Sequence, residues 1–271
     1  MRRLAAGAAF VLSAPALAAA GAQPAAIAGK WIAHDDGKMC GLARTSAGGD
    51  KVLFAVTLRP GGETSELRFL MPKGWVGPEQ PKIVTSLFPA GTRAEATALN
   101  FSEPGGGAVV LKAYLDHGFL EQLAQSNRIT VAVEGKLVIE TGYARAGGAV
   151  KALRDCGDQL LRSWGVDTSM LEKLQRKPKP IGSVASWVNA SDYPRAALAA
   201  GLSGTSVVRV LVGADGRPRN CVIVASSGSA DIDRQTCTVT RRGKFEPAIG
   251  PDGKPTAAPY ISMVNWIIPT G

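Results

Sequence analysis

The sequence predicts an α+β protein with two domains, and three observations support this fold class. Short apolar runs separated by Gly- and Pro-rich turns fill the N-terminal half, as in an antiparallel sandwich or barrel-like body. An apolar stripe over 149–164 then indicates one helix. The C-terminal third combines a clear hairpin with helix-like segments and a last strand. We therefore expect a β-rich domain closed by one helix, then a three-stranded antiparallel sheet with two helices.

The first domain is expected over 30–165, and its strands follow from apolar runs. Residues 118–125 are expected to form one or two helical turns between strands. Residues 149–164 repeat apolar side chains every three or four positions, which places them on one helix face. The strand-like runs are 52–58, 67–71, 83–88, 108–115, 129–133 and 137–139.

The N-terminus has the form of a secretory signal peptide. Arg2 and Arg3 precede an Ala-rich apolar run over 4–20. Ala16-Leu17-Ala18 and Ala20-Gly21-Ala22 are candidate cleavage sites. We expect residues 1–22 to be removed and the mature protein to lie in the periplasm. An uncleaved inner-membrane anchor is the alternative, although Pro15 and the weak hydrophobicity of Ala and Gly favour a signal.

Composition limits the classes of partner. The 271 residues are 45% hydrophobic and 20% charged, which describes a globular chain, not a disordered one. The net charge is +9, and loss of the two leading arginines leaves +7. A modest basic excess in an exported protein is compatible with a membrane surface, peptidoglycan or acidic partner proteins. Nucleic acid is not an expected partner, because no basic-aromatic patch supports it.

Four cysteines fit an oxidising compartment. Pairing within each half, Cys40 with Cys156 and Cys221 with Cys237, is the simplest of three possible connectivities. Cys156 shares the apolar face of the 149–164 helix, so its bond would tie this helix to the Cys40 segment. Closing so long a loop contributes ~4 kcal/mol in the chain-entropy model. No C-x-x-C spacing indicates a redox motif or zinc ribbon.

Residues 166–182 are interpreted as a linker. The segment is basic, and Pro178 and Pro180 stiffen its end. Lys-Pro-Lys-Pro cannot continue a helix and favours an extended chain. We interpret the segment as a solvated spacer in preference to a specific binding motif.

The second domain is expected over 183–271, around a hairpin in 207–227. Two β-branched runs flank Asp215-Gly216, and Gly216 can take the positive φ that a tight reversal needs. Pro194 is expected at the first position of one helix, where no amide donor is missed. Residues 232–242 are expected to form the second helix.

The final strand is expected over 257–268. Alternation places its side chains on two faces. Tyr260, Ser262, Val264 and Trp266 share one face, whereas Ile261, Met263 and Asn265 share the other. We interpret Tyr260 and Trp266 as packing residues, not as a ligand cage.

The C-terminal third resembles the C-terminal domain of the TonB family of energy transducers. The order and spacing of several short motifs carry this resemblance. They are Tyr193-Pro194, Gly204 before the valine strand, Asp215-Gly216-Arg217, Cys221 to Val224, Ser226-Ser227-Gly228, Ile232-Asp233, Phe245-Glu246-Pro247-Ala248 and Gly253-Lys254-Pro255.

The resemblance implies a fold and a role. TonB-like domains have a three-stranded antiparallel sheet with two helices on one face, and they transfer energy from an inner-membrane motor to outer-membrane receptors. They pair with an extended receptor segment through an open sheet edge. The implied partner is such a segment or another envelope protein, with help from the residues before Tyr193. The implied binding residues are Tyr260, Ile261, Ser262, Met263, Val264, Asn265 and Trp266.

The chain departs from a full transducer in three respects. It has no strong uncleaved N-terminal helix and no long Pro-rich spacer, and Asn189 to Asp192 match the family's polar segment weakly. The alternative is a periplasmic scaffold or binding protein that uses a TonB-like domain without energy transduction.

The first domain has a fainter resemblance to exported proteins of the invasion-associated locus B kind. Trp31, Cys40, Gly118-Phe119-Leu120 and the approach to a helix over 147–156 carry it. It supports only a β-rich secreted domain.

No enzyme is expected. His34 and His117 are the two histidines, and we expect both to be exposed at polar positions, His34 in a turn-like stretch. No Gly-x-Ser-x-Gly motif, paired carboxylates or phosphate loop accompanies them, and Gly105-Gly106-Gly107 lacks a following Lys-Ser/Thr. We therefore predict no catalytic residue, metal site or cofactor; the alternative is a hydrolase in the first domain.

Overall fold

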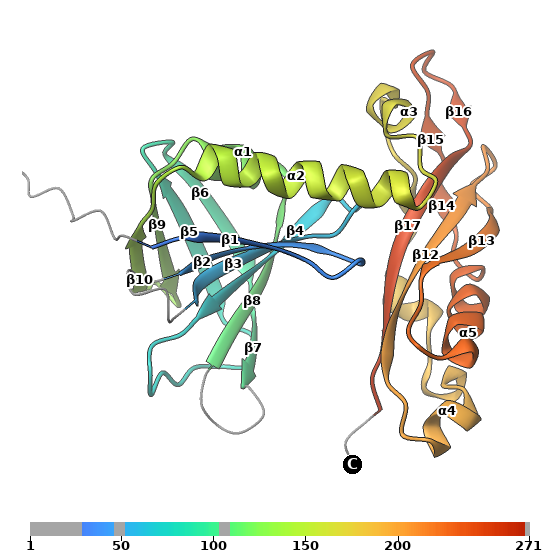
Figure 1. Ribbon diagram of the computed structural model, residues 1–271, viewed down its shortest axis with the longest axis horizontal. Coiled ribbons are helices and arrows are strands. Elements are labelled where there is room, and N and C mark those ends of the chain that lie inside the picture. The colour runs from blue at the N-terminus through green and yellow to red at the C-terminus, as the bar shows by residue number, and fades with distance from the viewer. Residues whose placement is uncertain (1–28, 46–51, 103–108, 269–271) are drawn as a thin grey trace, which may run out of the picture.

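The computed structural model describes residues 29–45, 52–102 and 109–268. The expected signal peptide over 1–22 and the Gly105-Gly106-Gly107 turn lie outside these residues. Figure 1 shows a β-rich N-terminal domain beside a smaller sheet with helices on its outer face. The α+β class predicted from sequence is confirmed.

The N-terminal domain is a sandwich of two antiparallel sheets, not a closed barrel. One sheet has the order β1-β2-β3-β4-β8-β7 and the other β10-β9-β5-β6. The strands of the first are β1 (Trp31–Asp35), β2 (Cys40–Thr45), β3 (Val52–Leu58), β4 (Thr64–Leu70), β7 (Leu99–Ser102) and β8 (Val109–Asp116). Those of the second are β5 (Lys82–Phe88), β6 (Thr92–Thr97), β9 (Arg128–Val133) and β10 (Lys136–Gly142).

Alternating apolar residues form the sandwich core. Phe54 and Leu67 point inward from the first sheet, and Ile83 and Ile129 from the second, all at most 1% exposed. Burial of such side chains contributes roughly 1.5–3 kcal/mol each. Four strands, β1, β2, β6 and β7, were not among the predicted runs. In β6, alanines alternate with polar residues and no side chain is fully buried, so it gives little apolar signal.

Two helices accompany the sandwich, α1 (Gly118–Ala124) and α2 (Ala146–Ser163). The predicted closing helix is confirmed and begins three residues earlier than expected. Its buried face includes Val150, Leu153 and Leu160. Figure 1 shows α2 lying across the sandwich, with its C-terminal end reaching the second domain.

The two predicted disulfides are present. Cys156 of α2 bonds to Cys40 of β2, which ties the helix to the sandwich. Cys221 bonds to Cys237 within the C-terminal domain.

The linker is packed against the C-terminal domain, so its interpretation as a solvated spacer was wrong. It contains α3 (Thr168–Lys173), which the Asp167 side chain caps, and Leu171 of this helix is buried in the core of the N-terminal domain. Farther along, the amide of Gln175 donates to the carbonyl of Ile249 in the C-terminal domain. The strand β11 (Lys179–Pro180) pairs with β14 (Phe245–Glu246). Proline restricts this stretch to extended backbone as expected, but extended backbone also suits strand pairing.

The C-terminal domain has the expected strands and helices. Its sheet has the order β13-β12-β17, formed by β12 (Gly204–Val212), β13 (Pro218–Ala225) and β17 (Ala258–Trp266). The helices are α4 (Arg195–Ala199) and α5 (Ala230–Thr240), so Pro194 precedes the first helix instead of beginning it. Short elements complete it: η1 (Val184–Trp187), η2 (Ala190–Asp192), β15 (Ala248–Ile249) and β16 (Pro255–Thr256).

The sheet face opposite the helices packs against the end of the sandwich. Val207, Ile261 and Met263 join the apolar core of the N-terminal domain. The guanidinium of Arg209 donates to the carbonyl oxygen of Gly165 at 2.5 Å, just beyond α2. The two domains therefore share a continuous core.

Candidate partner-binding edge

The last strand, β17, forms one edge of the C-terminal sheet. It pairs with β12 through nine consecutive residues without a register shift, from Gly204 opposite Trp266 to Val212 opposite Ala258. Among the described residues, no strand pairs with its other side. In an antiparallel pair, alternate residues direct their amide and carbonyl groups away from the partner strand. The outer side of β17 therefore presents a regular row of main-chain donors and acceptors.

The opposite edge, β13, is far less suited to strand pairing. It begins with Pro218, carries Arg219, and Asn220 has a positive φ of 48°. Its pairing with β12 has two register shifts. Proline, charge and bulges are the features that protect natural sheet edges. β17 also has a proline near its start, Pro259, but it contains no charged residue and no register shift. The two edges of this sheet thus differ, and β17 is the open one.

Side chains of β17 alternate between two packed faces, as predicted. Tyr260 packs on Phe245, with ring centroids 4.9 Å apart, and Trp266 lies beneath α5. Ile261 and Met263 face the N-terminal domain. The seven predicted binding residues are therefore adjacent along one strand, but most of their side chains serve packing. What remains for a partner is mainly the backbone, together with Ser262 and the exposed Asn265.

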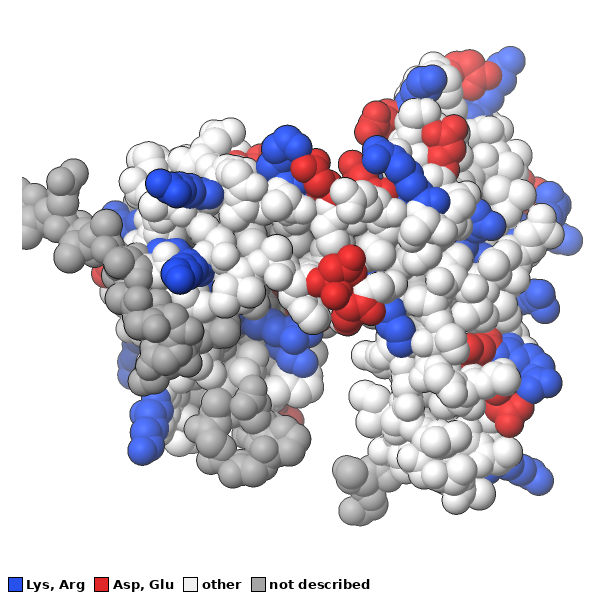
Figure 2. All heavy atoms as spheres, viewed as in Figure 1, with Lys and Arg blue, Asp and Glu red and all other residues white. Residues whose placement is uncertain are grey.

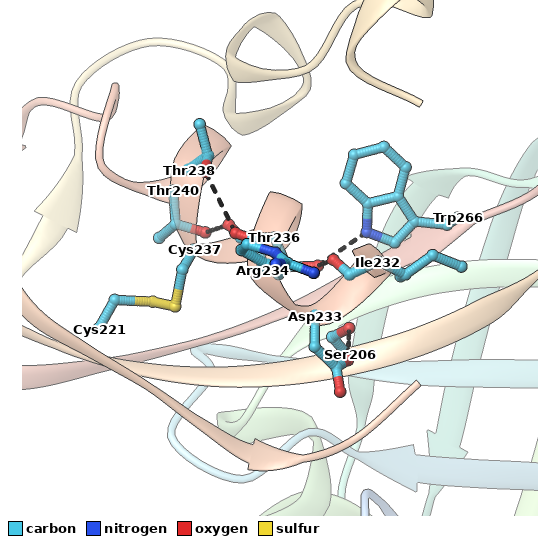
Figure 3. Close-up of a disulfide and its surroundings, with 10 residues drawn as sticks. All are labelled: Ser206, Cys221, Ile232, Asp233, Arg234, Thr236, Cys237, Thr238, Thr240 and Trp266. Carbon is cyan, nitrogen blue, oxygen red and sulfur yellow. Dashed lines mark hydrogen bonds between the residues drawn. A yellow bond between two sulfur atoms is a disulfide. The ribbon is translucent and has the colours of Figure 1, made fainter. Parts of the chain in front are cut away.

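Several polar contacts fix β17 and the strands beside it (Figure 3). The indole N–H of Trp266 donates to Thr236 Oγ1 at 2.8 Å, and Thr236 in turn donates to the carbonyl of Ile232. Asp233 accepts hydrogen bonds from the hydroxyls of Ser206 and Ser226. Burial raises the pKa of Asp233, but these donors outweigh burial and leave it below its usual value. Sequence reasoning quoted Asp233 only as a motif residue and missed its role in joining α5 to β12 and to the loop that follows β13.

The segment before Tyr193 is engaged within the domain. Asn189 and Asp192 form a capping box around η2. Asp192 also accepts two hydrogen bonds from Arg242, at 2.7 and 2.8 Å. These bonds hold the pKa of Asp192 below its usual value. The polar residues of this segment therefore stabilise the domain.

A cavity of about 290 Å³ lies beside β17, between the two domains. Its walls include the four consecutive residues Tyr260 to Met263. Since successive side chains point to opposite faces, a cavity that touches all four follows the edge of the strand. Lys38 of the β1–β2 turn, the β3–β4 turn with residues 59–64, Trp164 and the end of the linker contribute to its other walls.

The structure places the two histidines in different environments. His34 is exposed as expected, but it lies in strand β1 opposite Gly41, not in a turn. His117 follows β8 and is half-buried, not exposed, and burial lowers its pKa. Asp35, Cys40 and Cys156 lie close together, but the two cysteines are bonded to each other, so the group offers one carboxylate to a metal ion.

The comparisons with known proteins agree with this geometry. Residues 189–268 match the family model described as the Gram-negative bacterial TonB protein C-terminal. The C-terminal domain is a TonB-like domain. The resemblance stated from its motifs is confirmed, and the TonB-like domain includes the whole of β17.

Other comparisons are more distant. The crystal structure of invasion-associated protein B from Bartonella henselae is similar over 50% of this chain and 97% of that chain, at 11% identity and a TM-score of 0.36. None of the curated proteins is significantly similar to this chain. Across the described residues, no helix combines the length and apolar character needed to cross a membrane.

Proposed function

We propose that this protein binds an extended segment of an envelope protein by adding it as a strand to the outer edge of β17. The partner we propose is a segment of an outer-membrane TonB-dependent receptor, and the role is in transport across the outer membrane. The observation that carries this proposal is the contrast between the two edges, because only β17 is both regular in its pairing and free of charged residues. Strand addition uses main-chain hydrogen bonds for affinity and side-chain pockets for specificity.

The position of β17 supports the proposal. Its two faces are occupied, by α5 on one side and by the N-terminal domain on the other. A partner that pairs with the edge leaves both faces undisturbed. Figure 2 shows a hollow between the two domains, and white atoms predominate on its C-terminal wall, so few charges on this side oppose a docking strand.

The experiment compares lysine substitutions at two sheet edges. Ser262 of β17 and Ile223 of β13 lie opposite the same residue, Val208. Lysine on an edge strand opposes pairing with another strand. We expect Ser262→Lys to weaken binding of receptor N-terminal peptides to the mature protein at least tenfold, and Ile223→Lys to leave it unchanged.

Binding is measured by fluorescence anisotropy with labelled peptides, after matching thermal transitions establish that both variants fold. No binding to the wild-type protein at ~100 μM, weaker than typical specific contacts, contradicts the proposal. An equal loss of affinity in both variants also contradicts the proposal, because the edge of β17 would then contribute no more to binding than the edge of β13.

A periplasmic scaffold that does not couple to a motor is the second candidate. The observation that favours it is the continuous core between the two domains, which gives a compact body instead of a domain on a long tether. Cell fractionation separates the two. A soluble periplasmic product with a shortened N-terminus supports the scaffold, whereas an intact membrane-bound chain supports transduction.

A further inference from the structure

The cavity beside β17 takes its charged side chains from outside the TonB-like domain. The four charged residues that line it are Lys38, Arg59, Glu63 and Lys177. All four precede residue 189, where the family match begins. The N-terminal domain and the linker therefore determine the electrostatic character of the space next to the open edge.

Two of the cationic groups have no acidic partner among the described residues. Lys38 Nζ donates to the carbonyl oxygen of Thr205 at 2.8 Å, and neither Lys38 nor Lys177 forms an ion pair there. Both lysines are half-buried. Arg59, by contrast, pairs with Glu66 at 3.1 Å.

Most of the nearby carboxylates already have hydrogen-bond or ion-pair partners. Asp35 and Asp36 accept hydrogen bonds from the amides of their own turn. Glu66 is held by Arg59 and by Arg68. Glu63 is the one acid lining the cavity, and it is exposed at the tip of the β3–β4 turn.

We infer that the cavity selects an extended peptide carrying a carboxylate side chain, which Lys38 and Lys177 bind while the peptide backbone pairs with β17. This inference rests on the proposed function and adds the chemistry of the partner. A half-buried ammonium group loses part of its hydration, and a carboxylate within hydrogen-bond distance replaces the lost interactions with water. Hydrogen bonds between ionised groups are shorter and stronger than those between neutral groups.

The test uses three ten-residue peptides that are identical except at one central position, which is Glu, Gln or Lys. Their affinities for the wild-type mature protein are compared at low salt and at about 0.5 M salt, where the Debye length falls well below 10 Å. We expect the Glu peptide to bind about tenfold tighter than the Gln peptide, the Lys peptide to bind weakest, and salt to reduce these differences.

Charge-reversal variants complete the test. Lys177→Glu together with Lys38→Glu is expected to reverse the preference, so that the Lys peptide binds tightest. Lys136→Glu together with Lys82→Glu gives the same change in net charge on the second sheet of the sandwich, whose residues do not line the cavity, and is expected to keep the wild-type order.

The outcomes separate this inference from the proposed function. Equal binding of all three peptides to wild-type protein, with loss of binding in Ser262→Lys, overturns the carboxylate preference and leaves strand addition standing. Failure of every peptide to bind overturns both. Because the peptide comparison uses the wild-type protein, it does not depend on the folding of any variant.

Discussion

At the residue scale, the pair of Asp192 and Arg242 connects the family segment before Tyr193 to the body of the domain. The Asp192 side chain is only 6% exposed, whereas that of Arg242 is 44% exposed. Two parallel hydrogen bonds join them, which is the geometry that guanidinium and carboxylate groups form best. The carboxylate is therefore bound most strongly in its ionised state.

This pair predicts a pH dependence of stability. The hydrogen bonds from Arg242 depress the pKa of Asp192, so the stability it contributes is present above the ordinary carboxyl pKa of about 4 and is lost as pH falls through the folded-state pKa. Asp192→Asn is expected to unfold at lower urea than wild type at pH 7, and the difference is expected to shrink below pH 4. Urea titrations at pH 3 to 7 measure it.

The control for Asp192 is Asp215→Asn. Asp215 pairs with Arg219 at 2.8 Å, but the Asp215 side chain is 44% exposed, against 6% for Asp192. Exposed pairs contribute at most about 1 kcal/mol. An Asp192→Asn effect that is no larger than the Asp215→Asn effect contradicts the role given to Asp192.

Gly216 is the second residue with a specific requirement. Its φ is +73°, and an added Cβ would collide with the carbonyl oxygen of Phe245. The same turn receives a hydrogen bond, from the amide of Phe245 to the carbonyl of Gly216 at 3.1 Å. The turn of the β12–β13 hairpin thus packs on the segment that contains Phe245.

Gly216→Ala is expected to cost more than conformational strain alone. A left-handed backbone costs a non-glycine residue roughly 1–2 kcal/mol. Gly253 has a φ of +76° with nothing within 4 Å of an added Cβ, so Gly253→Ala carries that strain only. Chemical denaturation of both variants separates strain from collision; equal losses of stability contradict the packing argument.

At the element scale, the two disulfides hold helices to strands. The bond between Cys40 and Cys156 closes a loop with a sequence separation of 116 and ties α2 to β2. The bond between Cys221 and Cys237 spans a separation of 16 and ties α5 to β13. Since α5 covers one face of the sheet, the second bond also secures the edge opposite β17.

Removal of each disulfide gives a graded prediction. In the chain-entropy model, the short loop contributes about 3 kcal/mol and the long loop about 4 to 5 kcal/mol. We expect Cys40→Ser with Cys156→Ser to lower the urea midpoint more than Cys221→Ser with Cys237→Ser. The reverse order would show that native-state packing, not loop entropy, determines the contribution of each bond.

At the scale of the whole molecule, the contact between the two domains depends on the β3–β4 turn. Gly61 has a φ of +79°, and a Cβ there would lie 2.9 Å from a carbon of Ile261. This turn therefore packs directly on β17 and forms a wall of the adjacent cavity. The position of the turn determines both how the domains couple and how wide the space beside the edge is.

Gly61→Val is expected to uncouple the domains. Wild-type protein should unfold in one transition because the domains share a core, while the variant should unfold in two. Trp31 and Trp266 report on the separate domains, so variants that keep tryptophan in only one domain allow fluorescence to follow each. Gly91→Val is the control, with a φ of +72° and no atom within 4 Å of an added Cβ. Two transitions in the control as well would contradict the argument.

Much of the fold followed from local patterns. The Asp215-Gly216 hairpin, the alternation of β17 and the α2 stripe each depend on residues near in sequence. Backbone geometry allows each of these short patterns only one kind of secondary structure. The disulfide pairing followed from the expected oxidising compartment and from the position of Cys156 on the apolar face of its helix. Strands such as β6 were missed because their alanines and polar residues give no periodic apolar signal. His34 was misplaced for a similar reason, since β1 is exposed along most of its length.

The sequence by itself determined the α+β class, most of the strands and helices, the TonB-like domain and the strand whose edge is open. Only the tertiary structure decided what lies next to that edge. The linker, expected to be solvated, pairs with β14, and the β3–β4 turn packs on Ile261. Lys38 and Lys177 stand far apart along the chain from each other and from β17, and they line one cavity because the chain folds back on itself. Such long-range contacts depend on how two completed domains pack, and no local pattern encodes them.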